Sequence, residues 1–91
     1  MPNIASAKKR MRQNEVLRLR NRSRRSRLRS SLRQLDEAIA SGDIDTVGAC
    51  WKEAQSLLDR TAQSGVIHPK LAARKKARLS RRIQQLTSTS N

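Results

Sequence analysis

Hydrophobic residues recur in the middle and at the end of this chain at the three-to-four-residue spacing of amphipathic helices. Between residues 44 and 64 they share one face, made of Val47, Cys50, Trp51, Ala54, Leu58 and Thr61. The other face of this segment carries acids, among them Asp45, Glu53 and Asp59. Between residues 69 and 87 the apolar stripe is Ala72, Leu79, Ile83 and Leu86, with Lys70, Arg74, Arg78 and Arg81 opposite. Each segment therefore predicts a helix with one face for a core.

The first 41 residues hold a longer helical pattern whose apolar face is incomplete. An ordinary stripe begins at residue 28, with Leu28, Leu32, Leu35 and Ile39. Extended toward the N-terminus, the same stripe meets Leu17, Asn21, Arg24 and Arg25. This part has too little apolar surface to pack against another helix. We therefore expect residues 1–27 to form a basic arm that projects from the core, and to be fully ordered only when an anion surrounds it.

Two glycines and one proline predict where the helices end and begin. Gly42 and Gly65 each follow a periodic stretch, where a left-handed residue commonly ends a helix. Asp43 is a suitable N-cap residue, and Pro69 suits the first position of a helix. The predicted helices span 4–41, 44–64 and 69–87, with frayed polar residues from 87 to 91. The predicted fold is all-α, a three-helix bundle over 28–87 with a long basic first helix projecting beyond it.

Charge points to a polyanionic partner. The 91 residues suffice for a single small domain, and they carry 21 Lys or Arg against 7 Asp or Glu, a net charge of +14. Residues 1–35 hold twelve basic residues and one acid, residues 36–69 two and six, and residues 70–91 seven and none. Self-repulsion of this size destabilises a compact monomer unless an anion neutralises it. We expect both basic ends to contact the anion and the acidic middle to face water.

Nucleic acid is the partner that this pattern favours. Fifteen of the basic residues are Arg, whose planar fork grips two phosphate oxygens at once. Ser23, Ser26 and Ser30 share a face between the arginines, where they allow close approach of a sugar-phosphate backbone. Composition alone does not separate RNA from DNA, since a basic helix also fits a B-form major groove. There is no zinc-ligand spacing and no aromatic stacking platform.

Other function classes find little support in the residues. A membrane-surface helix needs a strong apolar face, but the arm offers only scattered apolar residues, namely Ile4, Met11, Val16, Leu17 and Leu19. Cys50 and His68 are single and far apart in sequence, so we predict no catalytic site, no metal site, no cofactor and no small-molecule substrate. Cys50 and Trp51 are expected in or beside the core. His68 is expected at the entry to the third helix.

Three stretches resemble the S-twenty family of bacterial small-subunit ribosomal proteins. Residues 3–10, N-I-A-S-A-K-K-R, look like the opening motif of the family, with Ala5 where a Lys is usual. Residues 21–30, N-R-S-R-R-S-R-L-R-S, resemble its second basic block. Residues 65–70 and 72–79 are similar to its closing turn and basic helix, with Pro69 where Lys is frequent. The resemblance covers essentially the whole chain, so it is far more specific than charge alone.

The resemblance implies a non-enzymatic structural protein that binds 16S ribosomal RNA directly and early in assembly. It implies contacts with the 5′ domain and with the long helix near the 3′ end of that RNA, with other subunit components reached mainly through RNA. Contact residues carried over by position are Asn3, Ser6, Lys8, Lys9, Arg10, Ser23, Arg25, Ser26, Arg29, His68, Lys70, Arg74, Lys75, Lys76 and Arg78. The charge pattern adds Arg12, Arg18, Arg22, Arg24, Arg27, Arg33 and Arg81.

The N-terminus bears on where the protein works. It contains no apolar run that predicts a signal peptide or a membrane span. A segment rich in Arg and Ser and poor in acids also fits an organelle transit peptide. Because the family-like motif begins within the first residues, we expect a cytoplasmic, ribosome-bound protein instead.

Overall fold

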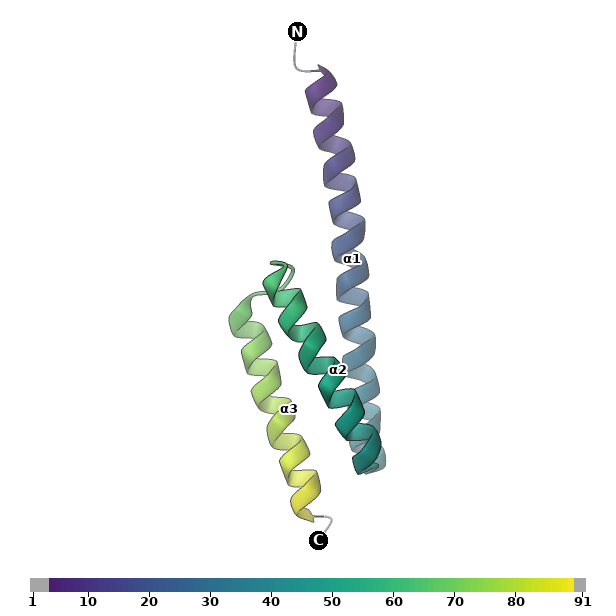
Figure 1. Cartoon of the computed structure of the whole chain (residues 1–91), viewed down its shortest axis with the longest axis vertical. Coiled ribbons are helices and arrows are strands. Elements are labelled where there is room, and N and C mark those ends of the chain that lie inside the picture. Colours follow the sequence, from purple (N-terminus) through teal and green to yellow (C-terminus); the bar gives the residue numbers. More distant parts are fainter. Residues whose placement is uncertain (1–3, 90–91) are drawn as a thin grey trace.

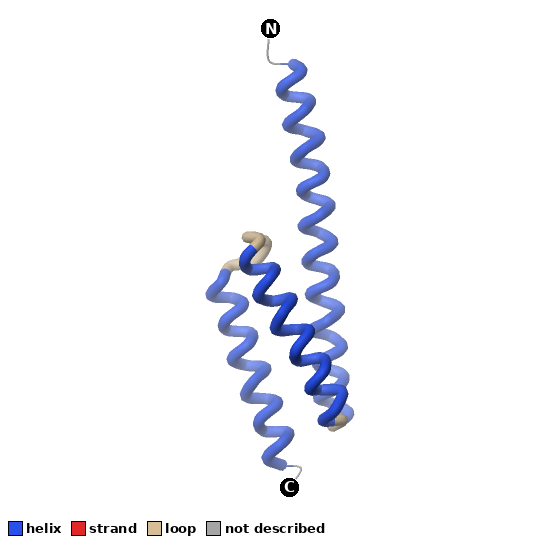
Figure 2. The backbone as a smooth tube through the Cα atoms, viewed as in Figure 1, coloured by secondary structure: helices blue, strands red, loops and turns tan. Residues whose placement is uncertain are grey.

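The computed structural model describes residues 4–89 and consists of three α-helices, with no strand in that range. They are α1 (Ile4–Ser41), α2 (Ile44–Gln63) and α3 (Pro69–Thr89), shown in Figures 1 and 2. The all-α prediction is confirmed, and α2 ends one residue before the predicted boundary. Asn3 lies outside the described residues.

The predicted end of the third helix at residue 87 is two residues short, because α3 continues to Thr89. The hydroxyl of Thr87 donates to the carbonyl oxygens of Ile83 and Gln84, at 3.2 and 3.0 Å, in the last turns of α3. Ser90 and Asn91 lie outside the described residues.

The helices form an antiparallel bundle from which half of one helix projects. α1 has 38 residues, about 57 Å at 1.5 Å per residue, and α2 runs back along only its C-terminal half (Figure 1). α3 runs antiparallel to α2 on its other side. The radius of gyration is 18.3 Å, against about 12 Å for a compact chain of this length. The projecting N-terminal part of α1 accounts for this elongation.

The core is a seam of small aliphatic side chains made of two adjoining clusters. One contains Leu35, Ala38, Val47, Ala54 and Leu79, and the other contains Leu28, Leu57, Leu58 and Ala72. Leu32 packs against both clusters, so the two form one continuous core. Each fully buried Leu stabilises the fold by about 2 kcal/mol through removal of apolar surface from water. Burial on α1 begins at Leu28, where the sequence stripe begins.

Two short turns reverse the chain, and both use a glycine in the left-handed region. Gly42 has φ 74° and donates its N–H to the carbonyl of Ala38 at 3.1 Å. Gly65 has φ 83° and donates to Ala62 at 3.0 Å, while Val66 donates to Thr61 at 3.1 Å, the paired bonds of a Schellman motif. The predicted glycine stops are thus confirmed. No described helix is both long and apolar enough to cross a membrane.

Candidate nucleic-acid interface

The projecting part of α1, residues 4–27, is exposed on every side. Only Asn21 within it is half-buried, and its apolar residues Met11 and Leu17 are 70% and 50% exposed. Within the described residues, the arm has one ion pair, between Arg18 and Glu15 at 3.2 Å. The other basic side chains of the arm have no acidic partner among residues 4–89. They are therefore free to neutralise the phosphates of a nucleic acid.

The predicted contact residues of α1 form one continuous basic and polar surface. They follow the helix from Ser6 to Arg33, and all are exposed. The serines at 23, 26 and 30 are exposed as well, whereas the neighbouring Ser31 is buried at 5% exposure. The serine face therefore points away from the core, as close approach of a sugar-phosphate backbone requires.

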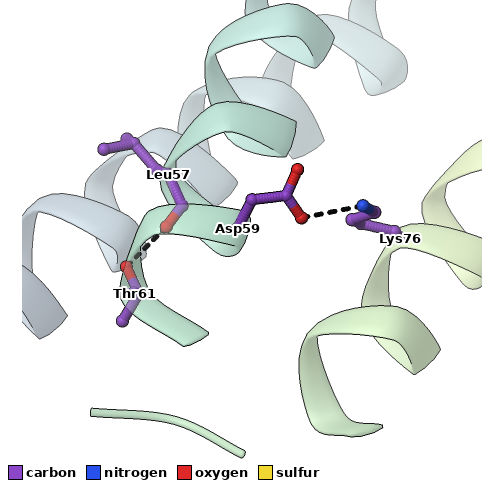
Figure 3. A network of polar contacts seen from close by, with 4 residues as sticks. All are labelled: Leu57, Asp59, Thr61 and Lys76. Carbon is purple, nitrogen blue, oxygen red and sulfur yellow. Dashed lines mark hydrogen bonds and ion pairs between the residues drawn. The ribbon is translucent and has the colours of Figure 1, made fainter. Parts of the chain in front are cut away.

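The predicted contact residues of α3 are exposed, with one exception. Lys70, Arg74, Lys75, Arg78 and Arg81 are exposed to solvent, whereas Ala72 and Leu79 of the same helix are buried. Lys76 is half-buried, and its Nζ lies 2.8 Å from Oδ1 of Asp59 on α2 (Figure 3). Its contact with a nucleic acid stays a prediction, and in this structure its ammonium group joins α2 to α3.

A second ion pair joins α3 to α1. Nη1 of Arg82 lies 2.7 Å from Oδ1 of Asp36. Both interhelical pairs are largely exposed, so each contributes no more than about 1 kcal/mol. Two acids of the middle segment, Asp36 and Asp59, are therefore engaged with cations of α3 rather than only facing water.

His68 caps the third helix. Its Nδ1 accepts a hydrogen bond from the backbone N–H of Lys70 at 3.1 Å, and its carbonyl accepts from Leu71 at 3.0 Å. The residue is exposed, so its ring can also meet a ligand. The prediction of a helix-entry residue is confirmed.

The fold brings part of the predicted interface together. Leu28 of α1 and Ala72 of α3 share a core cluster, so the base of the arm and the start of α3 lie at one end of the bundle (Figure 1). The His68 turn and Lys70 are at that end as well. Lys8, Lys9 and Arg10 belong to the first two turns of α1, and this end of the helix lies remote from the bundle (Figure 1). At the base of the arm, α1 and α3 both contribute predicted contact residues. At its tip, α1 alone does so.

Comparison with known proteins identifies the family. The family model "Ribosomal protein S20" matches residues 2–84. This chain belongs to that family. A small ribosomal subunit protein bS20 of Syntrophobacter fumaroxidans is 50% identical over 86 residues, covering 94% of this chain and 100% of the relative. Those of Rhodopirellula baltica and Desulfotalea psychrophila are 46% and 47% identical over 89 residues, covering 98% and 97% of this chain and 99% of each relative.

Family membership confirms the resemblance found in the sequence and decides between an enzyme and a structural protein. As a member of the S20 family, the chain is a structural protein of the small ribosomal subunit and not an enzyme, and it associates with the ribosome and its RNA. The described residues contain no cluster of three or more His, Cys, Asp or Glu side chains able to hold a metal ion.

One cation of this surface was not predicted. Arg60 of α2 lines a notch of about 140 Å³ together with Arg24 and Arg27 of α1, above Leu57 and Thr61. It was overlooked because it belongs to the acidic middle segment, which was expected to face water. Its spacing held a signal, since it lies three residues after Leu57, on the edge of the face that packs against α1.

Proposed function

We propose that this chain binds 16S ribosomal RNA directly and stabilises its fold during assembly of the small subunit. The observation that supports this most is the projecting part of α1. Its arginines, apart from Arg18, have no acidic partner in the described residues, and no residue of this part is fully buried before Leu28. The family resemblance favours the 5′ domain and the long helix near the 3′ end as the RNA segments contacted. The protein would work in the cytoplasm, as part of the ribosome.

The proposed mechanism is electrostatic, with recognition of RNA shape. Arginines on all sides of the arm neutralise phosphates where RNA helices crowd together, and the displaced counterions supply much of the binding free energy. The rigid bundle holds the base of the arm and the first turn of α3 at a fixed spacing. This spacing selects RNA by the arrangement of its backbone rather than by base sequence. We propose residues 1–27 as the inserted arm and 28–87 as the positioning bundle.

Competitive binding near ~0.15 M salt tests this function, because weak unspecific attraction is largely screened there. A labelled 5′-domain fragment of small-subunit rRNA would be challenged with excess duplex DNA and with excess unrelated structured RNA. We expect the fragment to remain bound against both competitors. Displacement by either one as readily as by unlabelled fragment would contradict direct, selective recognition of this RNA.

The same preparation tests the rival classes. A DNA-architectural protein would prefer the duplex DNA, and a membrane-surface protein would gain helicity with vesicles of anionic lipid. The apolar residues of the arm are exposed and scattered, so they form no apolar face for a membrane surface. They also give no reason to prefer duplex DNA to structured RNA.

A further inference from the structure

The base of the projecting arm contains a notch lined by three arginines from two helices. Arg24 and Arg27 of α1 and Arg60 of α2 surround it, and its volume is about 140 Å³. No acidic residue lines the notch.

The position of the notch follows from the antiparallel packing of α1 and α2. Leu28 packs in the same cluster as Leu57 and Leu58. Because α1 and α2 are antiparallel, the turn of α1 before Leu28 faces the turn of α2 after Leu57. This arrangement brings Arg24 and Arg27 next to Arg60. Leu57 and Thr61 form a floor that is only 7% and 4% exposed. Charges above such a poorly hydrated floor attract an anion more strongly than charges on an open helix.

Within the part of the chain that the structure describes, no acid neutralises the charge of the notch. Neither Arg27 nor Arg60 forms an ion pair with any acid in residues 4–89, and Arg24 contacts only Oδ1 of Asn21, at 3.5 Å. Asp59, the acid next to Arg60 in sequence, contacts Lys76 on the opposite side of α2 instead (Figure 3). The hydroxyl of Thr61 donates to the carbonyl of Leu57, so it does not occupy the notch as a donor.

The neighbouring groove between α1 and α3 shows the contrast. It contains Lys75, Arg78 and Arg82, but also Asp36, whose carboxylate is held by Arg82 at 2.7 Å. That groove carries an internal counter-charge, whereas the arginine notch carries none. Three unscreened guanidinium groups repel one another, and an external anion between them removes that repulsion.

From these observations we infer that Arg24, Arg27 and Arg60 form a clamp for one phosphodiester group of the RNA that the arm binds. The inference rests on the proposed function and extends it to α2, the helix of the acidic middle segment. A phosphate held at the fork of α1 and α2 fixes how far the arm enters the RNA. Arg60 is thus a positioning contact at the junction of the arm and the bundle.

Arg60 also lies in the last turn of α2, where a positive charge interacts favourably with the free carbonyl groups. A lysine fills that structural role equally well, but it lacks the planar fork that grips two phosphate oxygens. The two roles therefore separate when Arg60→Lys is compared with Arg60→Gln. Lys52 provides a matched control, because it is the other basic residue of the middle segment and is exposed on the same helix.

The experiment measures affinity for the 5′-domain rRNA fragment across a salt series, using the full chain. We expect Arg60→Gln to bind roughly tenfold more weakly at ~0.15 M salt, with a salt slope shallower by about one. Arg60→Lys should keep the slope and the melting temperature of the wild type, and lose about threefold in affinity. Lys52→Gln should stay within about twofold of the wild type.

Each failure has its own signature. If the wild type holds the fragment against competitors and Arg60→Gln behaves like Lys52→Gln, the clamp is wrong while the proposed function stands. If the wild type itself does not hold the fragment selectively, both are wrong. Arg27→Gln combined with Arg60→Gln should weaken binding by less than the product of the single effects, since both grip one phosphate. A full product would place the two arginines on separate phosphates and overturn the clamp.

Discussion

Leu35 lies fully buried at the centre of the core, with 0% of its surface exposed. Leu35→Ala removes apolar contacts and leaves a cavity, so we expect a loss of about 2–5 kcal/mol in the free energy of unfolding. This is a large share of the total expected for a chain of this length, about 5–15 kcal/mol. Urea denaturation followed by circular dichroism measures it. The control is Leu19→Ala, which truncates a 53% exposed leucine of α1 and should change stability by less than about 0.5 kcal/mol.

The core was largely predictable at the residue scale, because helical spacing specifies which residues share a face. Leu57, Ala38 and Ser31 were exceptions, because they lie outside the predicted stripes and are nevertheless only 7%, 5% and 5% exposed. Cys50 and Trp51 are half-buried and pack at the edge of the core, as expected. The width of the buried face of α2 depends on how closely α1 approaches it. The spacing of apolar residues along α2 alone does not determine this distance.

Asp43 makes the start of α2 sensitive to acid. Its carboxylate accepts hydrogen bonds from the hydroxyl and the backbone N–H of Thr46, at 2.6 and 3.4 Å. These bonds lower the pKa of Asp43 below its ordinary value of 3.8. The stabilisation is therefore fully present above pH ~4 and is lost as the pH falls through the lowered pKa of the folded state.

Asp43→Asn tests this sign. The difference in unfolding free energy between wild type and Asp43→Asn should be constant above pH ~5 and should shrink on acidification below pH ~4. Denaturant titrations at several pH values measure it, and the subtraction cancels the other carboxylates. A difference that stays the same down to pH ~2 would show that the charge of Asp43 does not strengthen the cap.

At the scale of elements, two glycines of similar exposure should respond in opposite ways. A Cβ at Gly48 or at Gly65 would meet no atom within 4 Å, so steric clashes do not enter. Gly48 is inside α2, where Gly48→Ala should stabilise by about 0.5–1 kcal/mol. Gly65 has φ 83°, and Gly65→Ala should destabilise by about 1–2 kcal/mol. Thermal unfolding of the two variants measures both effects, and equal signs would contradict the assigned turn.

Helix boundaries followed from local chemistry, which is why they were predictable. Gly42, Asp43, Gly65 and Pro69 act within a few residues of their own positions. The interhelical ion pairs were not predictable in the same way, since Lys76 and Asp59 are 17 residues apart and Arg82 and Asp36 are 46 apart. Their pairing depends on the rotation of each helix in the bundle. Arg60 was overlooked for the same reason, because only the packing of α2 on α1 brings it to Arg24.

On the scale of the whole molecule, shape and charge are linked. A bundle of this size could not bury a helix with so many arginines, because each buried cation would need a partner. The basic half of α1 therefore stands outside the core, and the molecule extends 72 Å along its longest axis. Acids are confined to the bundle apart from Glu15. An extended cationic helix on a small rigid base is suited to entering a crowded RNA fold.

This division predicts unequal local stability along α1 in the free protein. Residues 4–27 bury no apolar side chain that could offset the entropy of helix formation, and like charges repel along them, so their amides should exchange with solvent quickly. Amides near Leu35 and Leu58 should be protected by the core.

Hydrogen–deuterium exchange of the free chain and of its rRNA complex measures both regions at once. Binding should slow exchange over 4–27 by at least about tenfold, because RNA phosphates relieve the repulsion and fix the helix. The core amides serve as the internal control. Protection of 4–27 in the free chain equal to that of the core would show that the helix is stable alone, and the coupling of order to binding would then be wrong.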